Sequence, residues 1–299
     1  MHPELTGVGR IGLGCVTFGR EIDEDSAFRI MDHAMEIGIS LFDTAEVYGG
    51  GESEKIIGKW MQSRGVRRDV FLLTKVFTNF TRSHLKEALE GSLDRLQTDS
   101  LELYMFHRFD PETPMEEAVA AMDDAVKSGR AHACGCSNFS AVQLRTLLEI
   151  ARAGGITGPA AIQSNYNLAA PGIAEELLPL CVREKIAAIT YSPLGAGFLT
   201  GKYTADRAAF PKGSRFDVIP GHADVYFSER NFRVVDQLHA MAARVGVSAV
   251  RLAMGWVFQN PAVTTVLVGA RTTRHLDNAV EALQMNFPPE WLAEMNAWD

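Results

Sequence analysis

The sequence predicts a single (β/α)8 barrel. Eight short apolar or β-branched runs alternate with longer segments of helical period, the pattern of βαβ units in a parallel sheet. Successive runs lie mostly about 25 to 30 residues apart, enough for one strand and one crossover helix. The 299 residues would fit one barrel or two smaller domains, but the same unit recurs without a break in composition. One barrel is therefore favoured, and a doubly wound open sheet is the alternative.

Each expected strand is one of these short runs. In chain order, the runs cover residues 11–16, 40–43, 70–75, 101–107, 131–138, 160–163, 186–191 and 265–269.

The expected helices show apolar residues three and four positions apart, as on one helical face. Such faces comprise Ala27, Ile30, Met31, Ala34 and Ile37; Leu85, Ala88, Leu89, Leu93 and Leu96; and Leu276, Ala279, Val280 and Leu283. Asp25 or Ser26 can cap the first helix, and Gly38 ends it. Residues 113–116 and 140–143 each fit a capping box.

The alternation fails at residues 192–230, between the seventh strand and its helix. This segment contains many residues that interrupt regular structure: Pro193, Gly195, Gly197, Gly201, Pro211, Gly213, Pro220 and Gly221. Loops of this length in compact domains are usually functional or disordered.

Composition and charge exclude several classes of protein. Hydrophobic residues make up 46% and charged residues 22% of the chain, values typical of globular proteins. The 29 basic and 37 acidic residues give a net charge of −8, so we expect no nucleic-acid partner. No apolar stretch approaches the roughly 18 to 20 residues that span a bilayer, and residues 1–6 show no signal region. We therefore expect a soluble, cytoplasmic protein with no membrane partner.

The four cysteines are too few and too scattered for a disulfide scaffold. They are Cys15, Cys134, Cys136 and Cys181. No CxxC pair or nearby histidine has the spacing of a metal site, so we expect no metal. We expect buried thiols, with Cys134 and Cys136 on one face of a strand; a reactive role for this pair is the alternative.

Polar residues end most of the expected strands. They are Asp43, Lys75, His107, Ser137, Asn138, Gln163, Tyr191 and Ser192. Each alone has an ordinary explanation, such as a turn cap or a buried core histidine. A closed barrel, however, brings the carboxyl ends of all strands to one rim, where barrel enzymes have their active sites. Tyr48 lies five residues beyond Asp43, in the loop above the same rim.

Five segments give the chain a resemblance to the aldo-keto reductase superfamily. They are residues 43–48 (DTAEVY), 73–75 (LTK), His107 after an apolar strand, 135–139 (GCSNF), and 191–194 (YSPL) with 199–202 (LTGK). The segments occur in the family's order and extend over most of residues 1–299. The resemblance implies a barrel that reduces an aldehyde or ketone with NADP(H).

The residue types at the rim suit this chemistry. A carbonyl that accepts hydride needs a proton donor beside its oxygen, and the Tyr48 phenol can supply the proton. The Lys75 ammonium would help a phenol of ordinary pKa near 10 to exchange that proton, and Asp43 would keep Lys75 charged. His107 would donate a hydrogen bond to the carbonyl oxygen. The resemblance implies the same four catalytic residues.

The resemblance also implies which residues bind the nicotinamide end of the cofactor. Ser137, Asn138 and Gln163 would hold the carboxamide, and the ring would stack on Tyr191. The residues that open the long loop would let backbone N–H groups approach the pyrophosphate: Ser192, Pro193, Leu194, Gly195 and Ala196.

The 2′-phosphate and adenine would lie farther along the chain. Arg215 matches a family position that contacts the cofactor; it lies in the long loop, which would cover the cofactor and where Lys202 adds a positive charge at the pyrophosphate. The remaining candidates follow the last strand: Gly269, Arg271, Arg274, His275 and Asn278. His275 and Asn278 stand where the family usually has other residues. A helix N-terminus with two arginines suits a 2′-phosphate, so NADP(H) is expected rather than NAD(H).

Two features of the sequence qualify this interpretation. Arg108 follows His107 where many family members carry Trp, so we expect a polar or acidic carbonyl substrate. Residues 7–12 match GxGxxG, but no strand precedes them and no helix follows, so we do not interpret them as a nucleotide-binding loop.

Two other functions compete with carbonyl reduction. The first is a regulator that senses nicotinamide redox state, like the cytoplasmic beta subunits of potassium channels; His107 argues against it, because those subunits typically have Asn there. The second is a barrel isomerase or aldolase that uses Lys75 as a Schiff base, which conflicts with an Asp43 partner that keeps Lys75 protonated.

Overall fold

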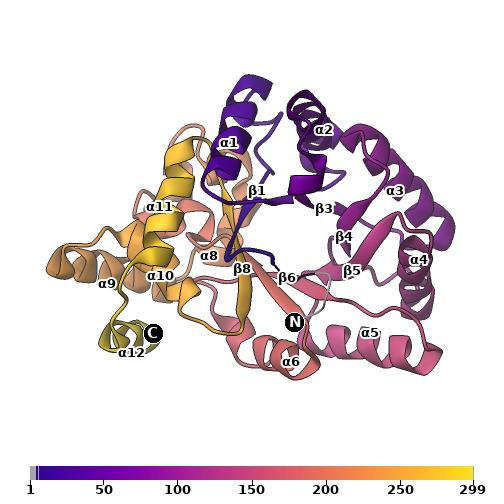
Figure 1. Cartoon of the computed structure of the whole chain (residues 1–299). Helices are drawn as coiled ribbons and strands as arrows, with labels where there is room; N and C mark the ends of the chain where they lie inside the picture. The colour runs from indigo at the N-terminus through magenta and orange to yellow at the C-terminus, as the bar shows by residue number, and fades with distance from the viewer. Residues whose placement is uncertain (1–4, 6, 299) are drawn as a thin grey trace.

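Eight parallel strands form a closed barrel in the computed structural model, which describes residue 5 and residues 7–298 (Figure 1). The strands follow chain order around the barrel, and β8 pairs with β1 to close it. They are β1 (Ile11–Gly14), β2 (Leu41–Asp43), β3 (Phe71–Val76), β4 (Leu101–Phe106), β5 (Ala131–Ser137), β6 (Ala161–Asn165), β7 (Ala187–Tyr191) and β8 (Val263–Gly269). The predicted single (β/α)8 barrel is confirmed, and the open sheet is wrong.

Helices surround this barrel (Figure 1). They are α1 (Glu24–Glu36), α2 (Glu52–Arg64), α3 (Arg82–Leu96), α4 (Met115–Lys127), α5 (Ala141–Gly154), α6 (Leu177–Glu184), α9 (Glu229–Val245), α10 (Ala249–Phe258), α11 (Thr273–Gln284) and α12 (Pro289–Asn296). The ring of helices closes where α1 lies beside α11: His33 Nε2 in α1 lies 2.6 Å from Asp277 Oδ1 in α11.

The strand pleat gives the barrel two cores. Leu41, Leu73 and Leu103 belong to the inner core, whereas Phe42 and Leu72 belong to the outer core beneath the helices. Successive side chains of a strand alternate between its two faces. Asp43 and Lys75, two residues beyond Leu41 and Leu73, therefore face the barrel interior at its rim.

All four cysteines are free and buried. Burial raises the pKa of each thiol, including those of Cys134 and Cys136, which share the outer core. The expectation of buried thiols on one strand face is confirmed.

Two of the expected helix caps are wrong and one is confirmed. At α5, Ser140 and Gln143 exchange the two hydrogen bonds of a capping box. At α4, Pro114 holds the cap position, because the hydroxyl of Thr113 instead donates to Asp110 Oδ2 at 2.7 Å. At α1, the carboxylate of Asp23 caps the helix by accepting from the backbone N–H of Ser26, so the helix begins before Asp25 and Ser26 can act as caps.

The segment between β7 and α9 is folded into short helical turns. These include η5 (Gly195–Thr200), α7 (Arg215–Val218) and α8 (Ala223–Tyr226). Aromatic side chains hold them together, with the rings of Tyr203 and Phe216 4.4 Å apart between centroids. The expected loop at 192–230 is thus a packed segment, and α9 begins within it.

Within the described part of the chain, no single helix is long and apolar enough to cross a membrane. The pair α9 and α10, bent by 104° at the break between them, meets the length and composition requirement only together. Residues 1–4 and 6, where no signal region is expected, lie outside the described residues, as does residue 299.

Candidate active site

The candidate site lies at the carboxyl ends of the strands. Asp43 is the last residue of β2, Lys75 lies near the end of β3, and His107 directly follows β4. Ser137 ends β5 and Tyr191 ends β7. Because all strands are parallel, these ends meet on the same side of the barrel.

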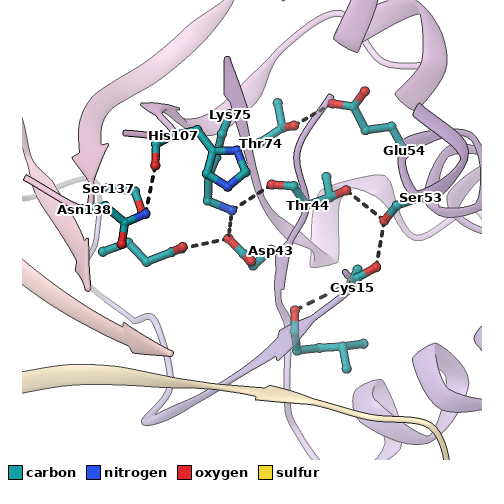
Figure 2. A network of polar contacts seen from close by, with 12 residues as sticks. Cys15, Asp43, Thr44, Ser53, Glu54, Thr74, Lys75, His107, Ser137 and Asn138 are labelled. Carbon is teal, nitrogen blue, oxygen red and sulfur yellow. Dashed lines mark hydrogen bonds and ion pairs between the residues drawn. The ribbon is translucent and has the colours of Figure 1, made fainter. Parts of the chain in front are cut away.

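A buried lysine and a buried aspartate form the centre of this site (Figure 2). Lys75 Nζ donates hydrogen bonds to Asp43 Oδ1 at 2.5 Å and to the carbonyl oxygen of Thr44 at 2.9 Å. The side chains of Lys75 and Asp43 are 0% and 6% exposed. A charge this deeply buried requires a counter-charge and hydrogen bonds, and the pair supplies both.

Gln163 also contacts this pair. Its amide Nε2 donates to Asp43 Oδ1 at 2.8 Å, so one carboxylate oxygen accepts from both Gln163 and Lys75. The family resemblance implied that Gln163 holds the cofactor carboxamide, and the sequence gave no indication of this contact.

Tyr48 opens the short turn η2 (Tyr48–Gly51), which connects β2 to α2. The Lys75 ammonium lies 5.1 Å from the centroid of the phenol ring. Burial raises the pKa of Tyr48 well above its ordinary value, and the negative charge of Asp43 raises it further. This direction is opposite to the one expected from Lys75 alone, because burial is the largest effect on the phenol. The phenol therefore keeps its proton at neutral pH.

The imidazole of His107 packs edge-on against Tyr48, with ring centroids 5.5 Å apart. Burial, followed by the positive charges of Lys75 and Arg108, lowers the pKa of His107 to about 3. His107 is thus neutral at physiological pH, with one N–H donor and one acceptor nitrogen. Its Nδ1 is buried and has no hydrogen-bond partner among the described residues. The arrangement offers a neutral phenol and a neutral imidazole side by side above the Lys75–Asp43 pair.

Asn138 connects the ends of three strands, β4, β5 and β7. Its Nδ2 donates to the carbonyl oxygen of His107 at 2.9 Å and to Ser137 Oγ at 3.1 Å. The hydroxyl of Tyr191 donates to Asn138 Oδ1 at 2.7 Å. These hydrogen bonds bring Ser137, Asn138 and Tyr191 together beside His107.

The start of the long loop forms a backbone turn suited to an anion. Ser192, Gly195, Ala196 and Gly197 all have left-handed φ values, between 54° and 88°. Such turns point successive N–H groups into one concavity, which is a known form of phosphate site. Pro193 and Leu194 lie within this turn, and Lys202 follows it, with its ammonium 5.1 Å from the ring of Tyr203.

The turn after β8 lies next to the long loop. Arg271 Nη1 donates to the carbonyl oxygen of Gly213 at 2.9 Å. His275 Nδ1 accepts from the backbone N–H groups of Arg271 and Thr272, so its ring helps to cap α11. Gly269 ends β8 and is exposed.

Three further predicted residues lie around this turn. Arg274 is exposed and Asn278 is half-buried, both in the first half of α11. Arg215 Nη1 lies 3.6 Å from Glu21 Oε1, and its positive charge partly offsets the rise in the pKa of Tyr48. Arg215 therefore faces the same rim as the phenol.

Three polar residues near the site were not predicted: Thr44, Ser53 and Glu54. All three are fully buried. The sequence contained a signal, because Ser53 and Glu54 fall on the face of α2 that also bears Ile57 and Met61, and polar residues on a buried face need partners.

The chain is similar over most of its length to proteins of one family. A family model described as the aldo/keto reductase family matches residues 10–299. The "Uncharacterized oxidoreductase YrpG" of Bacillus subtilis (strain 168) is 33% identical over 307 residues, which cover 97% of this chain and 91% of that protein. A "Probable voltage-gated potassium channel subunit beta" of Oryza sativa subsp. japonica is 34% identical, covering 90% of this chain and 85% of the relative. A "Putative voltage-gated potassium channel subunit beta" of Schizosaccharomyces pombe is 32% identical, covering 97% and 91%. The chain belongs to the aldo/keto reductase family.

Proposed function

We propose that this protein reduces an aldehyde or ketone to an alcohol with NADP(H). The observation that carries the proposal is the pairing of a neutral Tyr48 phenol and a neutral His107 imidazole above the buried Lys75–Asp43 ion pair. Together these groups can orient a carbonyl and deliver a proton to its oxygen.

Each of the four residues has a separate role. Bound NADPH would supply the hydride that reduces the carbonyl carbon. Tyr48 donates its proton to the carbonyl oxygen, which becomes the alcohol hydroxyl, and the phenolate formed is stabilised by the nearby Lys75 ammonium. Asp43 holds Lys75 in its charged form, and His107 donates a hydrogen bond to the carbonyl oxygen. Tyr48 then regains a proton from solvent.

The residues around the rim fit a dinucleotide. Ser137, Asn138 and Gln163 carry the hydroxyl and amide groups that a carboxamide needs, and the Tyr191 ring can stack on nicotinamide. The left-handed turn that contains Ser192, Pro193, Leu194, Gly195 and Ala196 suits a pyrophosphate. Residues 192–230 would cover the bound cofactor.

Positive charge near α11 favours NADP(H) over NAD(H). Arg271, Lys202 and Arg215 supply this charge, and the exposed Arg274 stands at the N-terminus of α11, where the helix dipole also attracts an anion. His275, Asn278 and Gly269 would line the remainder of the adenosine site.

Arg108 favours an acidic substrate. Its guanidinium lies 4.4 Å from the centroid of Phe77, and the Phe77 ring packs edge-on against His107 with centroids 5.5 Å apart. Arg108 is exposed, and its positive charge also acts on the nearby Asp110. A carbonyl held at His107 could thus present a carboxylate to Arg108. We expect Arg108→Ala to lower kcat/KM for oxo acids while leaving neutral aldehydes unaffected; an unchanged ratio would contradict this specificity.

A regulatory subunit with little turnover is the second candidate. The similarity to proteins named potassium channel beta subunits favours it. Neutral His107 beside Tyr48 favours reduction instead, because both groups are placed to act on a carbonyl oxygen.

One experiment separates the two candidates. The purified protein is mixed with NADPH and a panel of aldehydes, ketones and quinones, and NADPH absorbance is followed beside the Tyr48→Phe variant. A reductase consumes NADPH, and the variant loses at least about a hundredfold in turnover. Tight NADPH binding without turnover of any compound would instead favour the regulator.

The buried, unpaired thiols support a reducing compartment such as the cytoplasm.

A further inference from the structure

We propose that Thr44 and Ser53 form a hydroxyl clasp that positions the Tyr48 phenol against the Lys75–Asp43 pair. The clasp consists of the hydrogen bonds from Thr44 to Ser53 and from Ser53 to Cys15, shown in Figure 2. The proposal rests on the function proposed above, because it makes Thr44 and Ser53 positioning residues for the proton donor. Neither of these two hydrogen bonds involves Tyr48, so the clasp acts on the phenol through the turn that carries it.

The direction of each hydrogen bond in the clasp follows from proton counting. Ser53 Oγ lies 2.9 Å from the carbonyl oxygen of Cys15, which can only accept, so the single Ser53 hydroxyl proton is used there. Thr44 Oγ1 lies 2.9 Å from Ser53 Oγ and must therefore be the donor between the two hydroxyls. The backbone N–H of Cys15 donates to the carbonyl oxygen of Asp43 at 2.8 Å and closes the ring of contacts.

The clasp closes the turn that carries Tyr48. Thr44 and Ser53 are nine residues apart, and Tyr48 lies between them. Directly after Tyr48 come Gly49, Gly50 and Gly51, with φ values of 60°, 64° and 93°. Three consecutive glycines give this segment more conformational freedom than any other residue type would. A fixed connection at the base of the turn limits that freedom and holds the phenol in one place.

The same clasp reaches Lys75 by two routes. The carbonyl oxygen of Thr44 accepts a hydrogen bond from Lys75 Nζ at 2.9 Å. Glu54, next to Ser53, accepts from Thr74 Oγ1 at 2.5 Å and from Arg95 Nε at 2.7 Å, and Thr74 precedes Lys75 in β3. The first turn of α2 is thus attached to the ends of β2 and β3. A shift of Thr44 would move both an acceptor of Lys75 and the turn that bears Tyr48.

Two single variants and their combination test the clasp. Thr44→Val keeps the branched shape of the side chain and leaves the Ser53–Cys15 hydrogen bond intact. Ser53→Ala leaves the Thr44 hydroxyl and the Cys15 carbonyl without these partners, so it is the more disruptive change. Thr190→Val in β7 is the matched control, because the Thr190 hydroxyl is also fully buried yet has no partner among the described residues.

We expect both single variants to lower kcat about 10- to 100-fold while the Kd of NADPH stays unchanged, because small errors in placing a catalytic group have effects of this size. The double variant should be no slower than the slower single variant, because both changes remove the same connection. The solvent deuterium isotope effect on kcat should rise as proton transfer becomes limiting. Thr190→Val should keep wild-type turnover.

Hydrogen exchange of the backbone amides of Tyr48 and Gly50 tests the clasp without any turnover. Both amides donate within the turn, to Ala45 and Val47. Their exchange should accelerate in Thr44→Val and Ser53→Ala but not in Thr190→Val. Unchanged exchange together with wild-type kcat in Thr44→Val would overturn the clasp. If the wild type reduced no carbonyl, the proposed function would fail, whereas faster exchange in the variants would still support the clasp.

Discussion

The buried Lys75–Asp43 pair can be tested by removing one charge without changing shape. Asp43→Asn retains an oxygen that accepts from Lys75 Nζ and from Gln163 Nε2. The variant therefore leaves the Lys75 ammonium in a fully buried site without a counter-charge. Breaking a buried pair in this way typically destabilises a protein by about 3–5 kcal/mol.

The destabilisation caused by Asp43→Asn has an upper bound that depends on pH. In the Asp43→Asn variant, Lys75 can release its proton when the chain folds. Removing the proton from a lysine of ordinary pKa about 10.4 costs about 4.6 kcal/mol at pH 7. The unfolded chain then binds one more proton than the folded chain, so the free energy of unfolding rises with pH. The destabilisation should shrink by about 1.4 kcal/mol for each pH unit above 7.

Urea denaturation followed by circular dichroism measures this effect. We expect Asp43→Asn to be less destabilised at pH 9 than at pH 7 by about 2–3 kcal/mol. The double variant Asp43→Asn/Lys75→Met, which removes both charges, should recover most of the loss. Glu24→Gln is the control, because the Lys59–Glu24 pair is solvent-exposed and should show no such pH dependence. An equal loss at both pH values would refute the argument that Lys75 is held charged by Asp43.

Two further predictions follow from the site. The pKa of His107 is lowered to about 3, so its imidazole stays neutral in the folded state, whereas the unfolded chain takes up this proton below about pH 6.5. Between pH 8 and pH 5, His107→Asn should therefore lose about 2 kcal/mol less stability than the wild type loses. Equal losses for the two proteins in urea titrations would contradict this prediction. Arg271→Ala should weaken NADPH binding about tenfold or more, since hydrogen bonds to charged groups contribute about 1.5–3 kcal/mol. NADH binding is its control, and a parallel loss for both cofactors in fluorescence titrations would show that Arg271 acts only through its hydrogen bond to Gly213.

The barrel could be predicted because its strands are short apolar runs at regular spacing. Each strand begins and ends within two residues of its expected run. The polar residues at the rim could be predicted as a group, since parallel strands place their carboxyl ends together. Both predictions need only the order of residues along the chain and the topology of the barrel.

The contacts inside the site could not be predicted in this way. The hydrogen bond from Gln163 to Asp43 depends on how two side chains cross the barrel interior. The Thr44–Ser53 contact depends on the path of a turn with three glycines. The raised pKa of Tyr48 depends first on burial and then on the negative charge of Asp43, and the order of residues shows neither. Each of these features needs atomic positions rather than residue order.

The most direct test of the account follows the hydride itself. NADPH carrying deuterium at the transferred position is incubated with an aldehyde that the protein reduces, and the alcohol is analysed by mass spectrometry. We expect the wild type to place one deuterium on the former carbonyl carbon, and Tyr48→Phe to form almost no labelled alcohol while still binding NADPH. Labelled alcohol formed by Tyr48→Phe at the wild-type rate, or none formed by the wild type, would contradict the assignment of Tyr48, Lys75, Asp43 and His107 to carbonyl reduction.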